Sequence, residues 1–315
     1  MGYKRTYMVV ATLVVLVLVI FLLERPFREK GKETLLFEGF QPKDVTKIET
    51  RSGNQKITLE KAGDLWLVGG KEGYKADSSA IQDILHTMER LNRRDLVSKN
   101  PKKREVYEVN EKDGAEVKVY DNRGKLMAHL FLGKGGPDLF STYIRRADEN
   151  EVYLVEGYLK TTFIRSQEDW RDKTIFDFDP QHIHRIILES GGKRIVVERE
   201  DVGEWKLKRP QEQPADKGKL EDMIYTLATL KASRFPEEGE PKGYDWNNPK
   251  ARVTAILKDG GKRTLLIGSE EKGGGVYVKR QGEETIFMVP KYVVAKFVTS
   301  PGELKEKEVL RENGT

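Results

Sequence analysis

Two histidines are the residues in this chain whose type and spacing could bind a metal ion. His182 and His184 stand one residue apart in an apolar run that predicts a strand. At that spacing two imidazoles share one strand face and can hold zinc or nickel. The remaining histidines, His86 and His129, lie in a different part of the chain, so no third histidine is near. We therefore expect a solvated strand face here, with no metal site and no cofactor.

Other residue patterns that could support catalysis are incomplete. The run Gly133-Lys134-Gly135-Gly136 lacks the spacing of a phosphate-binding loop and stands between two predicted strands, so we expect a hairpin loop. Carboxylates are abundant on this charged chain, whereas glycosidase chemistry needs two held at a fixed separation. Neither H-E-x-x-H nor G-x-S-x-G occurs. We expect a non-enzymatic protein; an envelope hydrolase or a small-ligand sensor is the alternative.

A basic stretch between residues 91 and 106 is the strongest candidate for a binding function. The corresponding stretch later in the chain is charge-balanced, and duplicated domains can specialise where they differ. Such a loop could contact anionic lipid headgroups, an acidic partner or envelope polymers, or could simply be solvated. We do not expect nucleic acid. The candidate residues are Arg93, Arg94, Lys99, Lys102, Lys103 and Arg104.

Length and composition predict more than one globular domain. The chain has 315 residues, of which 37% are hydrophobic and 34% charged, with a net charge of +5. This is enough apolar content to bury the cores of two domains. The absence of cysteine excludes disulfides, thiolate metal sites and a lipoprotein anchor.

The N-terminal residues 1–30 predict a membrane anchor. Tyr7–Leu23 is an uncharged apolar run about 26 Å long as a helix, which approaches the hydrocarbon thickness of a bilayer. No small-residue cleavage site follows, so an uncleaved anchor is favoured over a cleaved signal peptide. Lys4 and Arg5 make a short basic N-terminus of the kind that stays in the cytoplasm, although the count of Lys and Arg on the two sides does not fix the orientation. We expect a single-pass protein of the cytoplasmic (inner) membrane with most of the chain extracytoplasmic, or periplasmic.

The rest of the chain consists of two similar copies of one sequence pattern. "DLWLVGGKEGYKAD" (64–77) is echoed by "GEWKLKRPQEQPAD" (203–216), and further matches run through both copies. Trp66 and Trp205 are expected to pack the helix against the sheet, and Asp77 and Asp216 to cap that helix.

Apolar periodicity predicts the same elements in each copy. Short alternating runs indicate strands, and a stripe at helical spacing follows each aspartate. The fold class is therefore α+β: two tandem homologous domains, each a mainly antiparallel sheet with one principal helix. The expected boundaries are a first repeat at 36–165, a linker at 166–178, a second repeat at 179–299 and a charged tail at 300–315.

These features together resemble a known bacterial family. The anchor, the "DVTKIE…ITLEK…LWLV" opening, the Ala-Asp before the helix, "YDWNNPKARVTAIL" and "LLIG…VYVKR…IFMV" are similar to the DUF4340 family. The family's usual Tyr-Gly-Leu-then-Pro phrase is altered to "YDWNNP" in the second copy and "YEVNEK" in the first. The resemblance implies an accessory protein of a gliding-motility-type ABC transporter, with a permease and an auxiliary extracytoplasmic subunit as partners. It implies no chemical activity.

Overall fold

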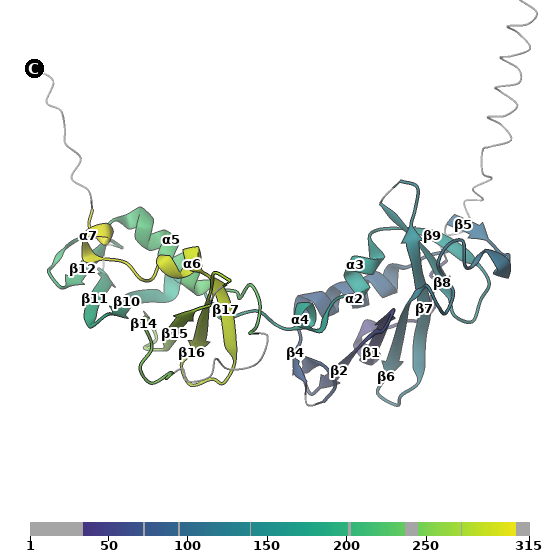
Figure 1. The fold of residues 1–315 in the computed structure, drawn as a ribbon, viewed down its shortest axis with the longest axis horizontal. Helices are drawn as coiled ribbons and strands as arrows, with labels where there is room; N and C mark the ends of the chain where they lie inside the picture. The colour runs from purple at the N-terminus through teal and green to yellow at the C-terminus, as the bar shows by residue number, and fades with distance from the viewer. Residues whose placement is uncertain are drawn as a thin grey trace, which may run out of the picture. The chain divides into compact units, whose positions relative to one another are not determined.

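The described chain forms two compact units (Figure 1). The computed structural model describes residues 34–306, except 72, 94, 139, 201–202, 237–244 and 272. Unit 1 ends at Asp172 and unit 2 begins at Lys173, and each has its own apolar core. The predicted anchor, Tyr7–Leu23, lies outside the described residues. Among the residues that are described, no helix is both long and apolar enough to cross a membrane.

Unit 1 is built on a nine-stranded sheet in the order β4-β3-β2-β1-β6-β7-β8-β9-β5, in which all neighbours are antiparallel. The sheet alternates buried and solvated side chains, as the sequence pattern predicts. Its strands are β1 (Val45–Ser52), β2 (Gln55–Ala62), β3 (Leu65–Val68), β4 (Tyr74–Lys75), β5 (Asp95–Ser98), β6 (Ala115–Asp121), β7 (Leu126–Gly135), β8 (Ser141–Arg146) and β9 (Val152–Glu156).

Unit 2 repeats this design with an eight-stranded antiparallel sheet in the order β13-β12-β11-β10-β14-β15-β16-β17. The central pair β10–β14 has the same irregularity at its start as the pair β1–β6. Its strands are β10 (Ile183–Ser190), β11 (Lys193–Arg199), β12 (Trp205–Arg209), β13 (Gln213–Pro214), β14 (Ala251–Leu257), β15 (Lys262–Glu270), β16 (Gly275–Arg280) and β17 (Ile286–Pro290).

Few helices accompany these sheets. One principal helix packs on a face of each sheet, α2 in unit 1 and α5 in unit 2 (Figure 1). The expectation of two mainly antiparallel domains is confirmed, with mostly β content. The helical segments are η1 (Pro42–Asp44), α2 (Ser78–Arg90), η2 (Pro101–Lys103), α3 (Leu159–Phe163), α4 (Gln167–Trp170), η3 (Pro180–His182), α5 (Lys217–Ala228), α6 (Lys291–Ala295) and α7 (Pro301–Leu304).

Both principal helices begin at the predicted aspartates. The Asp77 Oδ1 atom accepts hydrogen bonds from the backbone N–H of Ser79 at 2.8 Å and of Ala80 at 3.3 Å. The Asp216 carboxylate accepts one from the N–H of Lys219 at 3.1 Å. Each cap satisfies N–H groups that a first helical turn leaves unpaired. The apolar stripe that follows each cap is buried against the sheet.

The two predicted core tryptophans differ in burial. Trp205 is 5% exposed and belongs to the core of unit 2, whereas Trp66 is only partly buried at the margin of the core of unit 1. The fully buried tryptophan of unit 1 is Trp170, which follows the matched part of the first copy. Residues outside the recognised repeat therefore contribute to the core.

Residues 166–172 of the predicted linker and residues 300–306 of the predicted charged tail close the two units. In unit 1, the Asp77 N–H donates to the carbonyl of Trp170 at 2.8 Å. In unit 2, the Asp216 N–H donates to the carbonyl of Leu304 at 2.8 Å, and the Leu304 side chain is buried. Helices α4 and α7 are thus equivalent. Unit 1 continues through residue 172, and unit 2 includes residues 300–306.

The opening segments of the two units are also equivalent. The Leu36 N–H donates to the carbonyl of Leu91 at 2.7 Å, and the Ile175 N–H donates to the carbonyl of Leu230 at 2.8 Å. Both Leu36 and Ile175 are fully buried. Each unit therefore begins by pairing with the chain just beyond its principal helix, and residues 173–178 belong to unit 2.

Candidate functional site

The basic stretch lies at one edge of the sheet of unit 1. Strand β5 pairs with β9, where Asp95 faces Leu154, and has no further strand beyond it in the sheet order. In the described part of unit 2, only an isolated bridge between Arg234 and Met288 occupies the corresponding place. We refer to residues 95–106, which include β5 and η2, as the basic edge.

Two of the predicted binding residues hold the basic edge in position. The Arg93 guanidinium forms two hydrogen bonds with the Glu149 carboxylate, from Nη1 to Oε2 at 3.0 Å and from Nη2 to Oε1 at 2.7 Å. The Arg104 Nη2 atom donates to the Glu149 carbonyl at 3.3 Å. Both arginines are half-buried. They fasten the basic edge to the turn between β8 and β9, so they are structural residues.

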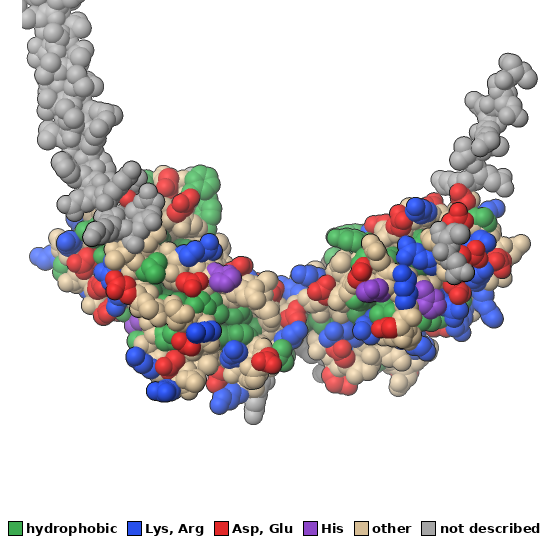
Figure 2. Space-filling model, turned by 180° about the vertical axis from the view of Figure 1, so that it is seen from behind, with side chains coloured by type: hydrophobic (Ala, Val, Ile, Leu, Met, Phe, Trp, Pro, Cys, Tyr) green, Lys and Arg blue, Asp and Glu red, His purple; other side chains and the backbone are tan. Residues whose placement is uncertain are grey.

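The three lysines of the basic edge remain available to a partner. Lys99, Lys102 and Lys103 are exposed, and none forms an ion pair among the residues that the structure describes. Arg94 lies outside the described residues. On the face drawn in Figure 2, positive and negative side chains are otherwise interspersed over both units. The lysines are therefore the part of the predicted site that is exposed to solvent.

A buried arginine also donates hydrogen bonds to the turn between β8 and β9. Arg145 is 0% exposed, and its Nη1 atom donates to the carbonyls of Arg146, Ala147 and Glu149 at 3.0–3.1 Å. Its Nε atom donates to the carbonyl of Val109 at 2.9 Å. Burial is the main cause that lowers the pKa of Arg145, and the nearby charge of Arg104 lowers it further. Sequence reasoning missed this residue, because alternation within β8 places Arg145 on the face opposite to the core residue Ile144, where a charged side chain is expected to be solvated.

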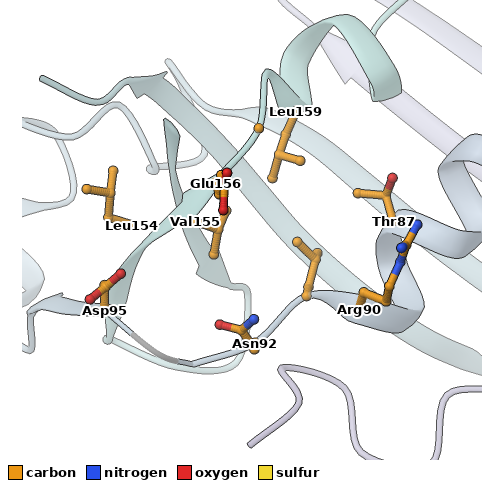
Figure 3. Close-up of a pocket in the computed structure, with 10 residues that line it drawn as sticks. Thr87, Arg90, Asn92, Asp95, Leu154, Val155, Glu156 and Leu159 are labelled. Carbon is orange, nitrogen blue, oxygen red and sulfur yellow. The ribbon is translucent and has the colours of Figure 1, made fainter. Parts of the chain in front are cut away.

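A groove lies beside the basic edge, at the C-terminal ends of α2 and β9 (Figure 3). It has a volume of about 620 Å³. Apolar side chains form its floor, and charges of both signs stand around it. The lining residues are Thr87, Arg90, Leu91, Asn92, Asp95, Leu154, Val155, Glu156, Gly157 and Leu159.

The corresponding place in unit 2 is bridged by a lysine. The Lys296 Nζ atom donates to Asp222 Oδ1 at 2.8 Å and to Thr226 Oγ1 at 3.0 Å. Thr226 is the repeat counterpart of Thr87, which lines the groove of unit 1, and Thr162 stands where unit 2 has Lys296. The two copies thus differ in side chains at one equivalent location.

Two exposed aromatic side chains stand beside the groove. Phe140 is 64% exposed and Tyr158 is 55% exposed, and their ring centroids are 5.9 Å apart in an edge-on arrangement. The carbonyl of Phe140 accepts a hydrogen bond from the N–H of Gly157, which lines the groove. In unit 2 the position of Phe140 is taken by Gly274. We refer to Phe140 and Tyr158 as the aromatic pair.

The comparison with protein families recognises both copies. A model of the family described as "Domain of unknown function (DUF4340)" matches residues 66–249 and, overlapping with these, residues 205–315. The chain belongs to the DUF4340 family. Two overlapping matches agree with the tandem arrangement of the units. No curated protein and no solved structure matches the chain.

The histidine pair of this DUF4340 protein is split between two elements. His182 ends η3, and His184 lies in β10, so the two do not share one strand face as the sequence pattern suggested. The exposed His182 ring has its Nε2 atom 3.9 Å from Asp179 Oδ2. Among the described residues, no group of three or more His, Cys, Asp or Glu side chains is placed to hold a metal ion.

The glycine run of this DUF4340 protein has a packing role. Gly133 lies within β7, so the strand extends into the region where a loop was expected. A Cβ atom at Gly133 would overlap the carbonyl oxygen of Tyr107 and approach Val109 Cγ1 at 2.7 Å. The Lys134 N–H donates to the same carbonyl at 3.2 Å. The glycine therefore permits the chain at 107–109 to lie directly on the sheet.

The most strongly shifted carboxylate in this DUF4340 protein belongs to a surface ion network. Burial alone would raise the pKa of Glu116, but hydrogen bonds from Lys118, Arg51 and His129 lower it to about 2. The Oε2 atom accepts from Arg51 Nε at 3.0 Å, and Oε1 lies 2.8 Å from Lys118 Nζ and 2.8 Å from His129 Nε2. A carboxylate held in its charged form by three partners supports the sheet and is poorly suited to proton transfer.

Proposed function

We propose that this DUF4340 protein is a non-enzymatic, membrane-anchored accessory or scaffolding protein, which binds a partner through unit 1 in the extracytoplasmic space. The supporting observation is the difference between the two copies. Unit 1 carries an open groove flanked by an exposed aromatic pair, whereas unit 2 has a lysine bridge at the groove and Gly274 in place of Phe140, and keeps a tyrosine, Tyr292, in place of Tyr158. Exposed aromatic side chains beside a groove are typical anchors of protein–protein interfaces.

The partner proposed for this surface is a subunit of an ABC transporter complex, either the permease or an auxiliary extracytoplasmic subunit. This part of the proposal rests on what the resemblance of the sequence to the DUF4340 family implies. The groove adds a chemical requirement, because its lining has Arg90 on the side of α2, Asp95 and Glu156 on the side of β5 and β9, and apolar side chains such as Leu159 as well (Figure 3). A partner segment with an apolar centre and flanking charges of both signs would fit this lining.

The test is co-purification of the full-length protein from its native membrane in mild detergent, followed by mass spectrometry. We expect transporter subunits to accompany the wild type and to be lost from a variant with Phe140→Ala and Tyr158→Ala. The matched control carries Tyr225→Ala and Tyr292→Ala, two tyrosines of unit 2 that are 62% and 73% exposed. If the control loses the subunits and the unit 1 variant keeps them, the assignment to unit 1 is wrong.

A second candidate is small-ligand sensing in the groove of unit 1. Its volume of about 620 Å³ is within the range of ligand pockets, and its lining combines apolar and charged groups. This function predicts that the Arg90→Ala variant loses a small molecule that co-purifies with the wild type. It gains support if native mass spectrometry finds such a ligand and no transporter subunit is recovered.

A further inference from the structure

We propose that the basic edge of unit 1 lies on the anionic headgroups of the bilayer that holds the anchor. The inference rests on the proposed membrane anchor and adds a second contact with the membrane. It assigns Lys99, Lys102 and Lys103 to lipid phosphates, and leaves the groove and the aromatic pair to the protein partner. The chemical class of the ligand is a phospholipid surface with net negative charge.

The first observation is a set of exposed lysines on a segment that is itself fixed, and within the described part of the chain these lysines form no ion pair. The guanidinium groups of Arg93 and Arg104 donate hydrogen bonds to Glu149 in the turn between β8 and β9. These bonds hold the basic edge at both ends. Between them, the Asn100 side chain accepts a hydrogen bond from the N–H of Lys102 at 3.0 Å. The intervening lysines are therefore presented on an ordered turn, which lowers the entropic cost of binding.

The second observation is apolar surface on the same segment. Leu96 and Val97 are each 37% exposed, and Val106 is 56% exposed. Exposed aliphatic side chains beside lysines are typical of segments that lie in a membrane interface, where the apolar groups enter the headgroup boundary and the ammonium groups reach phosphate.

The third observation is the place where the chain arrives from the predicted anchor. The Arg93 N–H donates to the carbonyl of Thr34 at 2.9 Å, and Leu35 forms a bridge with Asn92. Ten residues separate Leu23 from Thr34, so an extended chain reaches at most about 36 Å from the end of the anchor. The basic edge begins two residues after Arg93, so it lies within reach of the bilayer, which favours lipid as the occupant.

The test uses the absence of cysteine from this chain. The full-length protein with Val97→Cys is labelled with an environment-sensitive fluorophore and reconstituted into two kinds of vesicle. One kind is pure phosphatidylcholine, and the other is an equal mixture of phosphatidylcholine and phosphatidylglycerol. The matched control places the cysteine at Leu126, which is 45% exposed at the start of β7.

We expect a blue shift of the emission at position 97 only in the anionic vesicles, reversed by high salt because the contact is electrostatic. The label at position 126 should not respond. Combined charge reversal (K99E, K102E and K103E) should abolish the shift, since each lysine near an anionic surface contributes about fivefold to the bound population, or roughly a hundredfold together.

The outcomes separate this inference from the proposed function. An alkaline wash first shows whether the protein stays in the vesicles. If it stays and position 97 does not respond, or responds equally in neutral vesicles, the lipid contact is wrong while the anchor stands. If it washes out, the anchor is wrong and the lipid contact falls with it. A shift that appears only when native membrane proteins are added overturns the lipid contact in favour of a protein partner.

Discussion

Removing the buried guanidinium of unit 1 is expected to destabilise that unit severely. In the Arg145→Met variant, the aliphatic part of the side chain is kept while every hydrogen bond of the guanidinium is lost. The wild-type group also contacts Glu111 Oε1 at 3.0 Å and lies 4.7 Å from the centroid of the Phe131 ring. A methionine can replace the ring contact only in part.

The expected loss of stability in Arg145→Met follows from the backbone carbonyls that the guanidinium no longer binds. Four backbone carbonyls, those of Val109, Arg146, Ala147 and Glu149, would lose the guanidinium donor in a site where the arginine is 0% exposed. The Arg146 carbonyl still accepts from the Glu149 N–H at 3.3 Å and the Glu149 carbonyl from Arg104 Nη2 at 3.3 Å, so the carbonyls of Val109 and Ala147 are the two that lose the donor named here without another to replace it. A buried acceptor without a partner costs about 1 kcal/mol or more. Allowing for some entry of water, we expect the free energy of unfolding of unit 1 to fall by about 3–5 kcal/mol.

The matched control is the equivalent lysine of unit 2. Lys279 is 12% exposed and has one charged contact, at 3.5 Å to the Glu284 carboxylate, which is itself 96% exposed. Lys279→Met should therefore cost less than about 1 kcal/mol. Arg145→Lys, which keeps the charge and some donors, should fall between the two methionine variants.

Calorimetry of the full chain in mild detergent provides the assay, with hydrogen exchange to assign each transition to a unit. We expect Arg145→Met to lower the melting temperature of unit 1 by about 10 °C and to leave unit 2 unchanged. Equal effects of Arg145→Met and Lys279→Met would refute the reasoning, because the two cations differ chiefly in burial and in the number of carbonyls that they hold.

Three further predictions concern the stability of unit 1. Because the pKa of Glu116 is lowered from 4.5 to about 2, its contribution to the stability of unit 1 is fully present above pH 4.5 and is lost as the pH falls through about 2. Glu116→Gln should cost about 1–2 kcal/mol at pH 7, after allowance for solvent screening, and only a small part of that at pH 2, which urea titrations at both pH values can check. Gly133→Ala should destabilise by about 1–3 kcal/mol, because the new methyl group overlaps the Tyr107 carbonyl; unchanged stability in urea would count against that close approach. Trp170→Ala should cost about 3–5 kcal/mol and increase hydrogen exchange at Asp77, since the closing segment loses its buried side chain; no change at Asp77 would mean that α4 does not close the unit.

The sequence predicted most of both sheets and both principal helices. The reason is local, because strands such as β6 and β14 bury every second side chain, and this burial is visible in the sequence as alternation. The two aspartate N-caps could also be predicted from the sequence, since a cap accepts hydrogen bonds from N–H groups within the next three residues. Duplication then supplied each pattern a second time.

The closing elements were missed because their pattern is weak. In "SQEDWRD" a single apolar residue, Trp170, enters the core among charged neighbours, so no periodicity marks it. A usable pattern was present in the caps. Ser166 accepts a hydrogen bond from the Asp169 N–H, and Ser300 forms a capping box with Glu303. Serine followed three residues later by an acidic residue in both copies predicts these short helices.

The candidate site could be predicted only in part. The sequence located the basic stretch, but the roles of Arg93 and Arg104 depend on Glu149, which is far away in the chain. Strand β5 is short, and its pairing with β9 is non-local. The groove depends on the relative positions of α2 and β9 in the folded unit. The sequence shows a threonine at both equivalent positions, Thr87 and Thr226, and so does not reveal that one lines a groove while the other binds a lysine. These features follow from tertiary contacts that local patterns do not contain.

Site-specific photo-crosslinking in native membranes tests most directly the proposal that unit 1 binds a transporter subunit. A photoreactive phenylalanine analogue replaces Phe140 beside the groove, or Tyr225 in unit 2 as the control. The account predicts a covalent adduct with a membrane transporter subunit from position 140 and none from position 225. An adduct from position 225 alone, or none from either position while the protein remains membrane-bound, would contradict it.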